Sequence, residues 1–323
     1  MAGKIDVHHH TLPDFYRTPL SAAGDISGAP VKHWDEDTTL SIMAKQNIGI
    51  AVLSLSAPGA EIAGSHAEGR ALARKWNDYT HGLCISQPTR FGHFGALPSL
   101  IDTSGAIAEI QYALDELKCD GVTLFTSYDG KYLGHEDFAP IWAELNKRSA
   151  VVFVHPCHSP APTVWASPLL PQPIIDFPHE TTRAACDLIT SGRKRQNPNC
   201  KVILSHAGGT LPYLAARVEA LCTTLFGNLG VAGAPRGEQI TEDAKSFYFD
   251  TALSGTANIL DTLLKWAPAD RILFGSDSPY ATIEAEWNTR ALSEYPMEEE
   301  LRQKIYRDNV LKLIPRLGAR AEE

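Results

Sequence analysis

The sequence has no extended block of Lys and Arg and no hydrophobic stretch of membrane-spanning length. Its 29 Lys and Arg residues against 38 Asp and Glu give a formal net charge of −9. This balance disfavours nucleic acid or an anionic membrane surface as a partner. No apolar segment approaches the ~20 residues that a membrane-spanning helix requires. We therefore expect a soluble globular protein that binds neither nucleic acid nor a membrane.

Cysteine pairs and export signals are also missing. The six cysteines are scattered and form no C-x-x-C motif. In a chain of this length we expect them to be reduced thiols of an intracellular protein. Residues 1–6 lack the apolar region of a signal peptide, so we expect a cytoplasmic location. Hydrophobic residues make up 44% of the chain and charged residues 21%, which is typical of a folded domain.

Short apolar segments alternate with longer segments of helical pattern along the chain. Strands that are buried on both faces of a parallel sheet have this apolar composition. The predicted strands are 4–8, 50–55, 92–97, 121–125, 151–155, 202–206, 247–251 and 272–276. The predicted helices are 37–46, 65–84, 104–117, 137–148, 179–191, 211–226 and 256–267.

Eight strand and helix units of this kind predict an α/β fold, a closed (β/α)8 TIM barrel. A doubly wound open sheet is the alternative, but it usually carries a glycine-rich phosphate loop after its first strand. Two long connections, 11–34 and 156–178, each follow a predicted strand. In a barrel such loops form the active-site face. We therefore expect one domain over 1–323, with these two loops as walls of the pocket.

Histidine and aspartate recur where the predicted strands end. They are His8 and His10 on the first strand, His155 on the fifth, His206 on the sixth and Asp277 after the eighth. Residues i and i+2 of a strand face the same way, so the first two histidines point together while His9 points away. A barrel gathers the carboxyl ends of its strands around one rim. We therefore expect these five side chains to form one metal-binding and catalytic cluster.

Imidazole and carboxylate donors together suit Zn²⁺ or Mn²⁺ better than Mg²⁺ or Ca²⁺. A catalytic zinc site typically has ~3 protein ligands and keeps one position open. His8, His10, His155 and Asp277 can supply such a shell, which would leave His206 to act as acid, base or polarising group. The spacing alone does not decide which histidine stays off the metal. A non-catalytic barrel with a structural metal, or with none, is the alternative.

Five segments together resemble the amidohydrolase-2 branch of the amidohydrolase superfamily, from Ile5 to about Leu313. They are Ile5-Asp6-Val7-His8-His9-His10-Thr11-Leu12-Pro13, Val154-His155-Pro156, Pro178-His179-Glu180-Thr181-Thr182, Ser205-His206-Ala207-Gly208-Gly209 and Gly275-Ser276-Asp277-Ser278-Pro279. That branch contains the aminocarboxymuconate-semialdehyde, γ-resorcylate, salicylate and 6-methylsalicylate decarboxylases. The third, fourth and fifth segments look closest to the 6-methylsalicylate decarboxylases.

The resemblance implies a role for each strand-end residue. The metal ligands of the family fall on His8, His10, His155 and Asp277, and its catalytic histidine falls on His206. The implied reaction is a non-oxidative decarboxylation without an organic cofactor. One divalent metal ion per chain is expected, Zn²⁺ in preference to Mn²⁺, together with a homodimeric assembly.

The sequence departs from the muconate-semialdehyde enzyme at one substrate-binding position. Thr39 stands where that enzyme has an arginine for a substrate carboxylate, which favours an o-hydroxybenzoate over an acyclic acid with two carboxylates. Among such acids, the resemblance implies the conversion of 6-methylsalicylate to m-cresol and CO₂ as the expected reaction. Arg217 falls near the place of an arginine that a neighbouring subunit donates in that enzyme, although a surface position is equally expected. Phe15, Trp165 and Tyr280 are further candidates for substrate contact.

The alternative function is metal-dependent hydrolysis of a lactone or an amide at the same site. A metal ion lowers the pKa of a bound water towards ~7, and His206 or Asp277 would then serve as base. A lactonase acting on a dicarboxylate would need basic residues on the pocket loops. Residues 11–34 offer only Arg17, Lys32 and His33, and residues 156–178 offer only His158. Decarboxylation is therefore the preferred reading, with either Asp277 or His206 as the group that protonates the ring.

Overall fold

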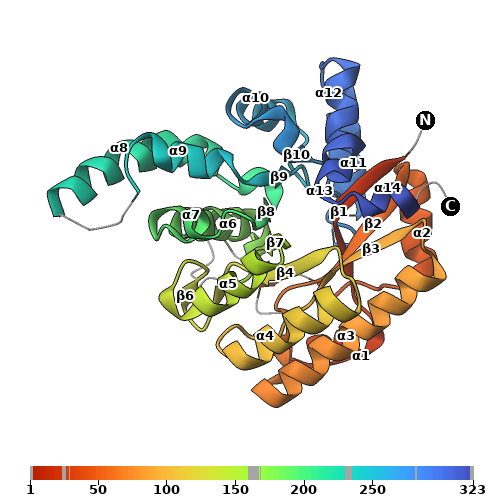
Figure 1. The fold of residues 1–323 in the computed structure, drawn as a ribbon. Coiled ribbons are helices and arrows are strands. Elements are labelled where there is room, and N and C mark those ends of the chain that lie inside the picture. The colour runs from red at the N-terminus through yellow and green to blue at the C-terminus, as the bar shows by residue number, and fades with distance from the viewer. Residues whose placement is uncertain are drawn as a thin grey trace.

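The fold is an eight-stranded parallel barrel, nearly closed, with helices between the strands (Figure 1). A computed structural model describes residues 3–23, 27–28, 30–158, 167, 169–229, 235–280 and 282–320. In the order of the sheet, the strands are β1 (Lys4–Thr11), β2 (Ile48–Leu55), β3 (Phe91–Gly95), β4 (Gly121–Phe125), β7 (Val151–His155), β8 (Lys201–Leu204), β9 (Tyr248–Asp250) and β10 (Ile272–Leu273). This arrangement confirms the predicted fold class. A small hairpin of β5 (Ser127–Tyr128) and β6 (Lys131–Tyr132) follows β4.

The barrel closes between its first and last strands through the backbone that follows β10. The amide of Val7 donates to the carbonyl of Phe274 at 3.0 Å, and the amide of Asp277 donates to the carbonyl of His8 at 2.9 Å. A third bond joins the amide of His10 to the carbonyl of Ser278 at 2.7 Å. This seam places the residues after β10 directly beside the histidine-rich end of β1.

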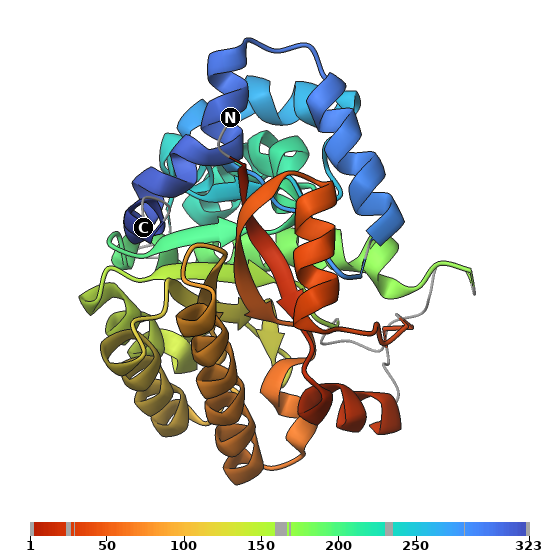
Figure 2. The same ribbon diagram turned by 90° about the vertical axis from the view of Figure 1, so that its right-hand side faces the viewer.

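Most helices lie close to the predicted ranges. They are α2 (Glu36–Lys45), α3 (His66–Ser86), α4 (Thr103–Gln111), α5 (Ala139–Lys147), α6 (Gln172–Thr190), α8 (Leu211–Leu229) and α10 (Ala257–Trp266). Further helices that we did not predict are α1 (Asp14–Ala23), α7 (Arg193–Gln196), α9 (Glu238–Lys245), α11 (Thr282–Glu294), α12 (Glu299–Gln303), α13 (Asn309–Leu313) and α14 (Arg316–Arg320). Seen from the side in Figure 2, the helices surround the central strands.

The two long loops are shorter than we expected. Helix α1 lies within 11–34, and α6 begins at Gln172 rather than at His179. Both helices contain a proline beyond their first turn, Pro19 in α1 and Pro178 in α6. Proline in a helix interior removes one backbone hydrogen bond and usually ends the helix. For this reason the sequence pattern did not predict helix in α1 or in the first part of α6.

A layer of buried apolar side chains fills the interior of the barrel beneath the strand ends that carry the histidines. Its buried members are Ile5, Val7, Ile50, Val52, Phe94, Val151, Phe153, Ile203, Leu273, Val310, Ile314 and Leu317. The rings of Phe94 and Phe153 stack with centroids 5.6 Å apart. Phe153 in turn lies edge-on to His8 at 5.0 Å, so this layer forms the floor beneath the histidines of β1.

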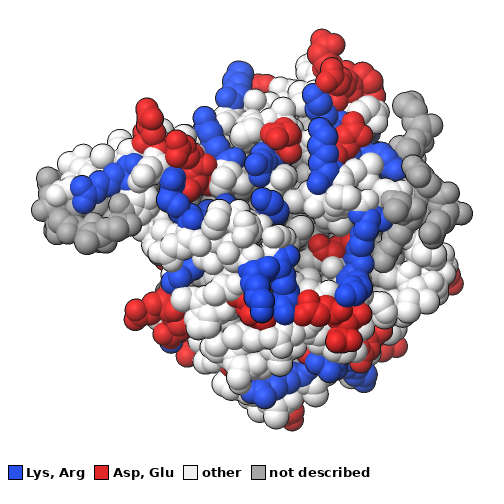
Figure 3. Space-filling view, in the orientation of Figure 1, with Lys and Arg blue, Asp and Glu red and all other residues white. Residues whose placement is uncertain are grey.

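Helices α8 and α9 extend outward from the barrel and form what we call the α8–α9 arm (Figure 1). Acidic and basic side chains are interspersed over the face of the molecule that Figure 3 shows. Among the described residues, no helix combines the length and the apolar character needed to cross a membrane.

Candidate metal and catalytic centre

Four of the predicted strand-end residues meet at the carboxyl end of the barrel. One donor atom each from His8, His10, His155 and Asp277 lies within 4.8 Å of the other three. The Oδ1 atom of Asp277 is 3.4 Å from His8 Nε2 and 3.2 Å from His10 Nε2. The two Nε2 atoms are themselves 3.2 Å apart. We call this group the rim centre.

The local structure explains why these side chains converge. His8 and His10 occupy alternate positions of β1, so both face the barrel axis, and His155 is the last residue of β7. Asp277 follows β10 in a left-handed conformation with φ of 63°. Its amide is tied to the carbonyl of His8, which fixes the carboxylate beside β1.

The hydrogen bonds around the rim centre leave suitable atoms for a metal ion. The Nδ1 of His8 donates to Asp250 Oδ2 at 2.9 Å, and the Nδ1 of His155 donates to the carbonyl oxygen of Pro156 at 2.7 Å. Both partners can only accept, so each ring in its neutral form carries its proton on Nδ1 and keeps a lone pair on Nε2. Three imidazoles and one carboxylate are donors that a borderline divalent cation prefers. The residues present therefore fit a single divalent metal ion.

The electrostatics of the rim centre are dominated by burial. Burial alone would raise the pKa of the Asp277 carboxyl, but its contacts with His10 and His8 hold that pKa well below its usual range. Burial lowers the pKa of His10 to about 4, and burial with the neighbouring imidazoles holds the pKa of His155 well below its usual value. Burial also opposes the charged form of His8, but Asp250 and Asp277 outweigh it and raise the pKa of His8 to about 10.

The fifth predicted residue, His206, lies beside the rim centre just after β8. Its ring centroid is 4.9 Å from that of His8 and 6.2 Å from that of His155. The Nδ1 of His206 donates to the carbonyl oxygen of Ala252 at 3.1 Å, which leaves Nε2 as the atom that can exchange a proton. Burial lowers the pKa of His206.

Asp250, at the end of β9, is a site residue that the sequence analysis missed. It is wholly buried, and its carboxylate contacts both the ring of His8 and the backbone amide of His206. Together with those two histidines it forms the second group of potential ligands in the described part of the chain. The signal was present, because Asp250 lies near the end of a predicted strand just as the other site residues do.

The candidates for substrate contact are placed less uniformly. The ring of Tyr280 lies 5.4 Å from that of His10, at the edge of the rim centre. Phe15 lies on α1, where its ring packs against Tyr79 of α3 at 5.7 Å. Arg217 is exposed on the α8–α9 arm. Trp165 lies outside the described residues.

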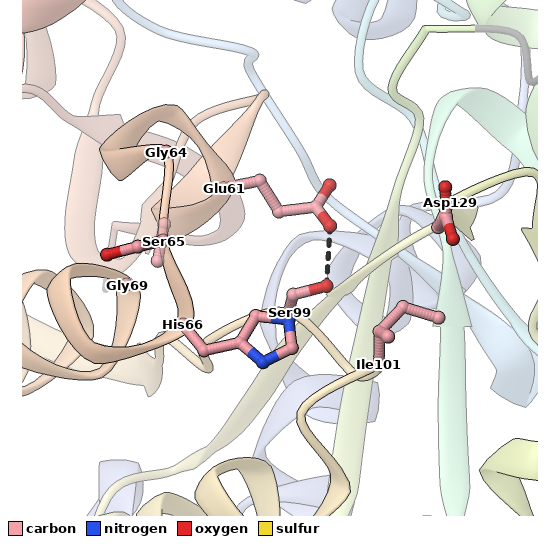
Figure 4. Close-up of a pocket in the computed structure, with 9 residues that line it drawn as sticks. Glu61, Gly64, Ser65, His66, Gly69, Ser99, Ile101 and Asp129 are labelled. Atoms are coloured by element: carbon pink, nitrogen blue, oxygen red, sulfur yellow. Dashed lines mark hydrogen bonds between the residues drawn. The ribbon is translucent and has the colours of Figure 1, made fainter.

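A separate recess of about 230 Å³ opens near the ends of β2, β3 and β4 (Figure 4). There the Ser99 hydroxyl donates to Glu61 at 2.6 Å, and His66 and Asp129 form opposite sides of the recess. Burial raises the pKa of Glu61. The ligand groups in the described residues include none of these side chains, so the recess is distinct from the rim centre.

Comparison with known proteins places this centre in context. The family model described as amidohydrolase matches residues 5–316. The 6-methylsalicylic acid decarboxylase of Aspergillus aculeatus is 46% identical over 322 residues, which cover 97% of this chain and 96% of that protein. The 6-methylsalicylic acid decarboxylase of Penicillium expansum is 42% identical, covering 97% of each chain.

Two solved structures are similar over almost the whole chain. A 2,6-dihydroxybenzoate decarboxylase in complex with 2,6-dihydroxybenzoate has a TM-score of 0.80 and 26% identity, covering 98% of this chain and 100% of that one. A dihydroxybenzoic acid decarboxylase of Polaromonas sp., with bound manganese and the inhibitor 2-nitroresorcinol, has a TM-score of 0.79 and 25% identity. In that case 98% of this chain and 97% of the other are covered.

Proposed function

This chain belongs to the amidohydrolase family, and we propose that it converts 6-methylsalicylate to m-cresol and CO₂ at the rim centre. It is a carboxy-lyase that decarboxylates a hydroxybenzoate without oxidation. The observation that carries the choice of substrate is the 42–46% identity to two 6-methylsalicylic acid decarboxylases over nearly their full length. The convergence of His8, His10, His155 and Asp277 supports the rim centre as the place of the reaction, because it provides the donors for a metal ion.

In this proposal the four side chains of the rim centre hold one divalent cation. Zn²⁺ is our first choice, and Mn²⁺, which a similar decarboxylase structure contains, is the alternative. When bound, the cation supplies positive charge that orients the substrate carboxylate and phenolate oxygens and stabilises their negative charge.

The side chains of the centre then move one proton. The donor adds a proton to the ring carbon that carries the carboxylate, because direct loss of CO₂ would leave an unstable carbanion on the ring. The bond between this carbon and the carboxylate then breaks, its electron pair restores the aromatic ring, and CO₂ leaves. The proton comes from Asp277 of the rim centre or from Nε2 of His206 beside it.

Substitution of His206 shows which of these two residues donates the proton. We expect His206→Ala to lower kcat by about 10²–10⁴-fold, which is the usual contribution of a positioned acid or base. Stopped-flow measurement of m-cresol formation at saturating substrate and metal would give kcat directly. A variant with the kcat of the unmodified enzyme would remove His206 from this role and leave Asp277 as the donor.

The substrate assignment is tested by direct turnover. The purified protein, analysed for metal content, is incubated with 6-methylsalicylate, salicylate or γ-resorcylate while the phenol product and CO₂ are measured. We expect 6-methylsalicylate to react fastest, a chelator to abolish turnover, and added Zn²⁺ or Mn²⁺ to restore it. Failure of all three acids with about one bound metal ion per chain would contradict the proposal. Hydrolysis of a lactone panel under the same conditions would then favour the alternative function.

We also propose a homodimer in which Arg217 contributes to the site of the partner subunit. Arg217 lies on α8 among exposed apolar side chains, with Tyr213, Leu221 and Leu225 exposing 82%, 55% and 51% of their surface. Large apolar side chains that are exposed together commonly mark a protein interface. Sedimentation analysis would give the assembly state. Mixing Arg217→Ala with His206→Ala should restore activity in heterodimers, and no recovery would contradict the sharing of Arg217.

A further inference from the structure

Asp250 makes an unusual set of contacts for a residue that is not itself one of the four rim ligands. Its Oδ2 accepts from His8 Nδ1 at 2.9 Å, while its Oδ1 accepts from the backbone amides of His206 at 3.0 Å and Ala252 at 2.9 Å. The side chain is fully buried in β9, so water does not compete for these bonds. Three donors from three segments of the chain are therefore fixed by one carboxylate.

The contact with His8 fixes the tautomer of that ring. A carboxylate oxygen accepts hydrogen bonds and cannot donate them, so the ring proton of His8 stays on Nδ1. In the neutral ring Nε2 then keeps its lone pair on the side where Asp277 Oδ1 lies 3.4 Å away. Partners of this kind orient ligating imidazoles and make them better donors.

The contact with His206 holds a segment of backbone in a strained conformation. His206, Ala207, Gly208 and Gly209 all have positive φ values, between 54° and 74°. Such conformations cost free energy for residues with a side chain and persist only where the surrounding contacts hold them. Asp250 holds the amide of His206, and the carbonyl oxygen of Ala252 holds its ring.

We propose that Asp250 is a positioning residue that sets the tautomer of His8 and the place of His206 at the same time. This inference rests on the proposed metal-dependent function, because it assigns His8 to the metal. It links the metal ligand and the proton-transfer residue through one buried carboxylate. Loss of that carboxylate should therefore act on metal binding and on turnover in a way that a general loss of stability does not.

The variant Asp250→Asn separates the two roles. Asparagine has the same shape but only one acceptor oxygen, and the two backbone amides of His206 and Ala252 can only donate. The oxygen therefore stays with these amides, and the amide NH₂ faces His8. A hydrogen bond from this NH₂ requires an unprotonated Nδ1, which moves the ring proton to Nε2, the atom needed for the metal.

Asp120→Asn is a matched control elsewhere in the barrel. Asp120 is also a buried aspartate, and its Oδ2 accepts from the backbone amide of a histidine, His93, at 2.9 Å. Its other oxygen accepts from Arg316 at 2.5 Å. The same substitution there disturbs a buried carboxylate without touching a rim histidine.

The test is a titration of chelator-treated protein with Mn²⁺, followed by electron paramagnetic resonance of the free ion. We expect Asp250→Asn to weaken Mn²⁺ binding by about 10–100-fold, while Asp120→Asn binds Mn²⁺ like the unmodified protein. Excess Mn²⁺ should restore the turnover of Asp250→Asn, because its His206 contact is retained. Unchanged Mn²⁺ affinity in Asp250→Asn, equal loss in both variants, or turnover that excess Mn²⁺ does not restore would overturn the proposal.

A measurement on the unmodified protein covers the case in which Asp250→Asn does not fold. In the Co²⁺-loaded enzyme, slowly exchanging ring protons on Nδ1 of His8 and His155 should give at least two shifted proton resonances. Fewer than two would contradict the assigned tautomers. The Mn²⁺ titration and the Co²⁺ spectrum use no substrate. Mn²⁺ binding that depends on Asp250, without turnover of any hydroxybenzoate by the unmodified protein, would therefore refute the proposed function and leave this inference standing.

Discussion

Two buried clusters in this barrel are built around histidine, and they differ in whether their donor atoms converge on one point. The rim centre brings His8, His10, His155 and Asp277 together at the carboxyl ends of three strand segments. The second cluster, which we call the thiol cluster, consists of Cys84 on α3, His93 on β3 and Cys119 just before β4. In it, Cys84 Sγ is 3.4 Å from His93 Nδ1, and Cys119 Sγ is 2.9 Å from His93 Nε2.

The comparison shows that convergence, and not residue type, decides which cluster can bind a metal ion. The sulfur atoms of the thiol cluster lie at opposite nitrogens of one ring, so the imidazole separates them. In the rim centre each ring offers one nitrogen to a common point. Cysteine and histidine are both good zinc ligands, yet the two ligand groups of the described residues contain only the rim residues, His206 and Asp250. We therefore expect the rim centre to govern activity and the thiol cluster to govern stability.

Among the tests of these two roles, we expect the largest effect from His155→Ala. Removing one of four donors should lower kcat/KM for 6-methylsalicylate by about 10³-fold or more, because the charge stabilisation by a bound metal is worth several kcal/mol. Metal analysis of the same preparation should show a reduced metal content. Activity within tenfold of the unmodified enzyme would place the metal elsewhere. It would contradict the expectation that the rim centre governs activity and the thiol cluster governs stability.

His93→Ala tests the opposite half of the comparison. His93 is only 1% exposed, and its removal leaves a cavity between β3 and α3 together with two buried thiols that have lost a partner. We expect the free energy of unfolding to fall by about 2–4 kcal/mol, as for other large-to-small changes in a core. Denaturant titration followed by circular dichroism measures this loss.

The control is to make both measurements on both variants after chelation, so that bound metal does not add to the measured stability. His93→Ala should keep its kcat for 6-methylsalicylate below the unfolding transition. His155→Ala should lose less stability than His93→Ala, since His155 opens towards the substrate side of the barrel. A large loss of kcat in His93→Ala would show that the thiol cluster contributes to catalysis.

The sequence predicts the rim centre well because its geometry follows from the fold. Once eight apolar segments are recognised as barrel strands, the side chains at their carboxyl ends share one rim, whatever their separation in sequence. His8, His155 and Asp277 are brought together in this way. Asp250 also lies near a strand end, but its role depends on its contacts with His8 and with the amides of His206 and Ala252. Strand composition carries no information about such contacts.

The thiol cluster and several helices were harder to predict for related physical reasons. His93 on β3 contacts Cys84 on α3 and Cys119 just before β4, and no short spacing in the sequence marks these contacts. Helices α1 and α6 contain Pro19 and Pro178, and a proline in the sequence usually predicts the end of a helix. In the barrel, tertiary packing holds both segments in helical form despite the lost hydrogen bond.

The smallest expected effect concerns the reactivity of the thiols themselves. Burial raises the pKa of Cys119, so at pH 8 its sulfur is held as the neutral thiol, which is a poor nucleophile. Burial raises the pKa of Cys222 on α8 as well, but this side chain is only partly buried. Iodoacetamide at pH 8, followed by peptide mass spectrometry, should therefore label Cys222 well before Cys84 and Cys119. In His93→Ala the labelling rates of Cys84 and Cys119 should come closer to that of Cys222, because a less stable protein opens more often. Equal labelling of all three thiols in the unmodified protein would contradict a thiol cluster that is closed to solvent.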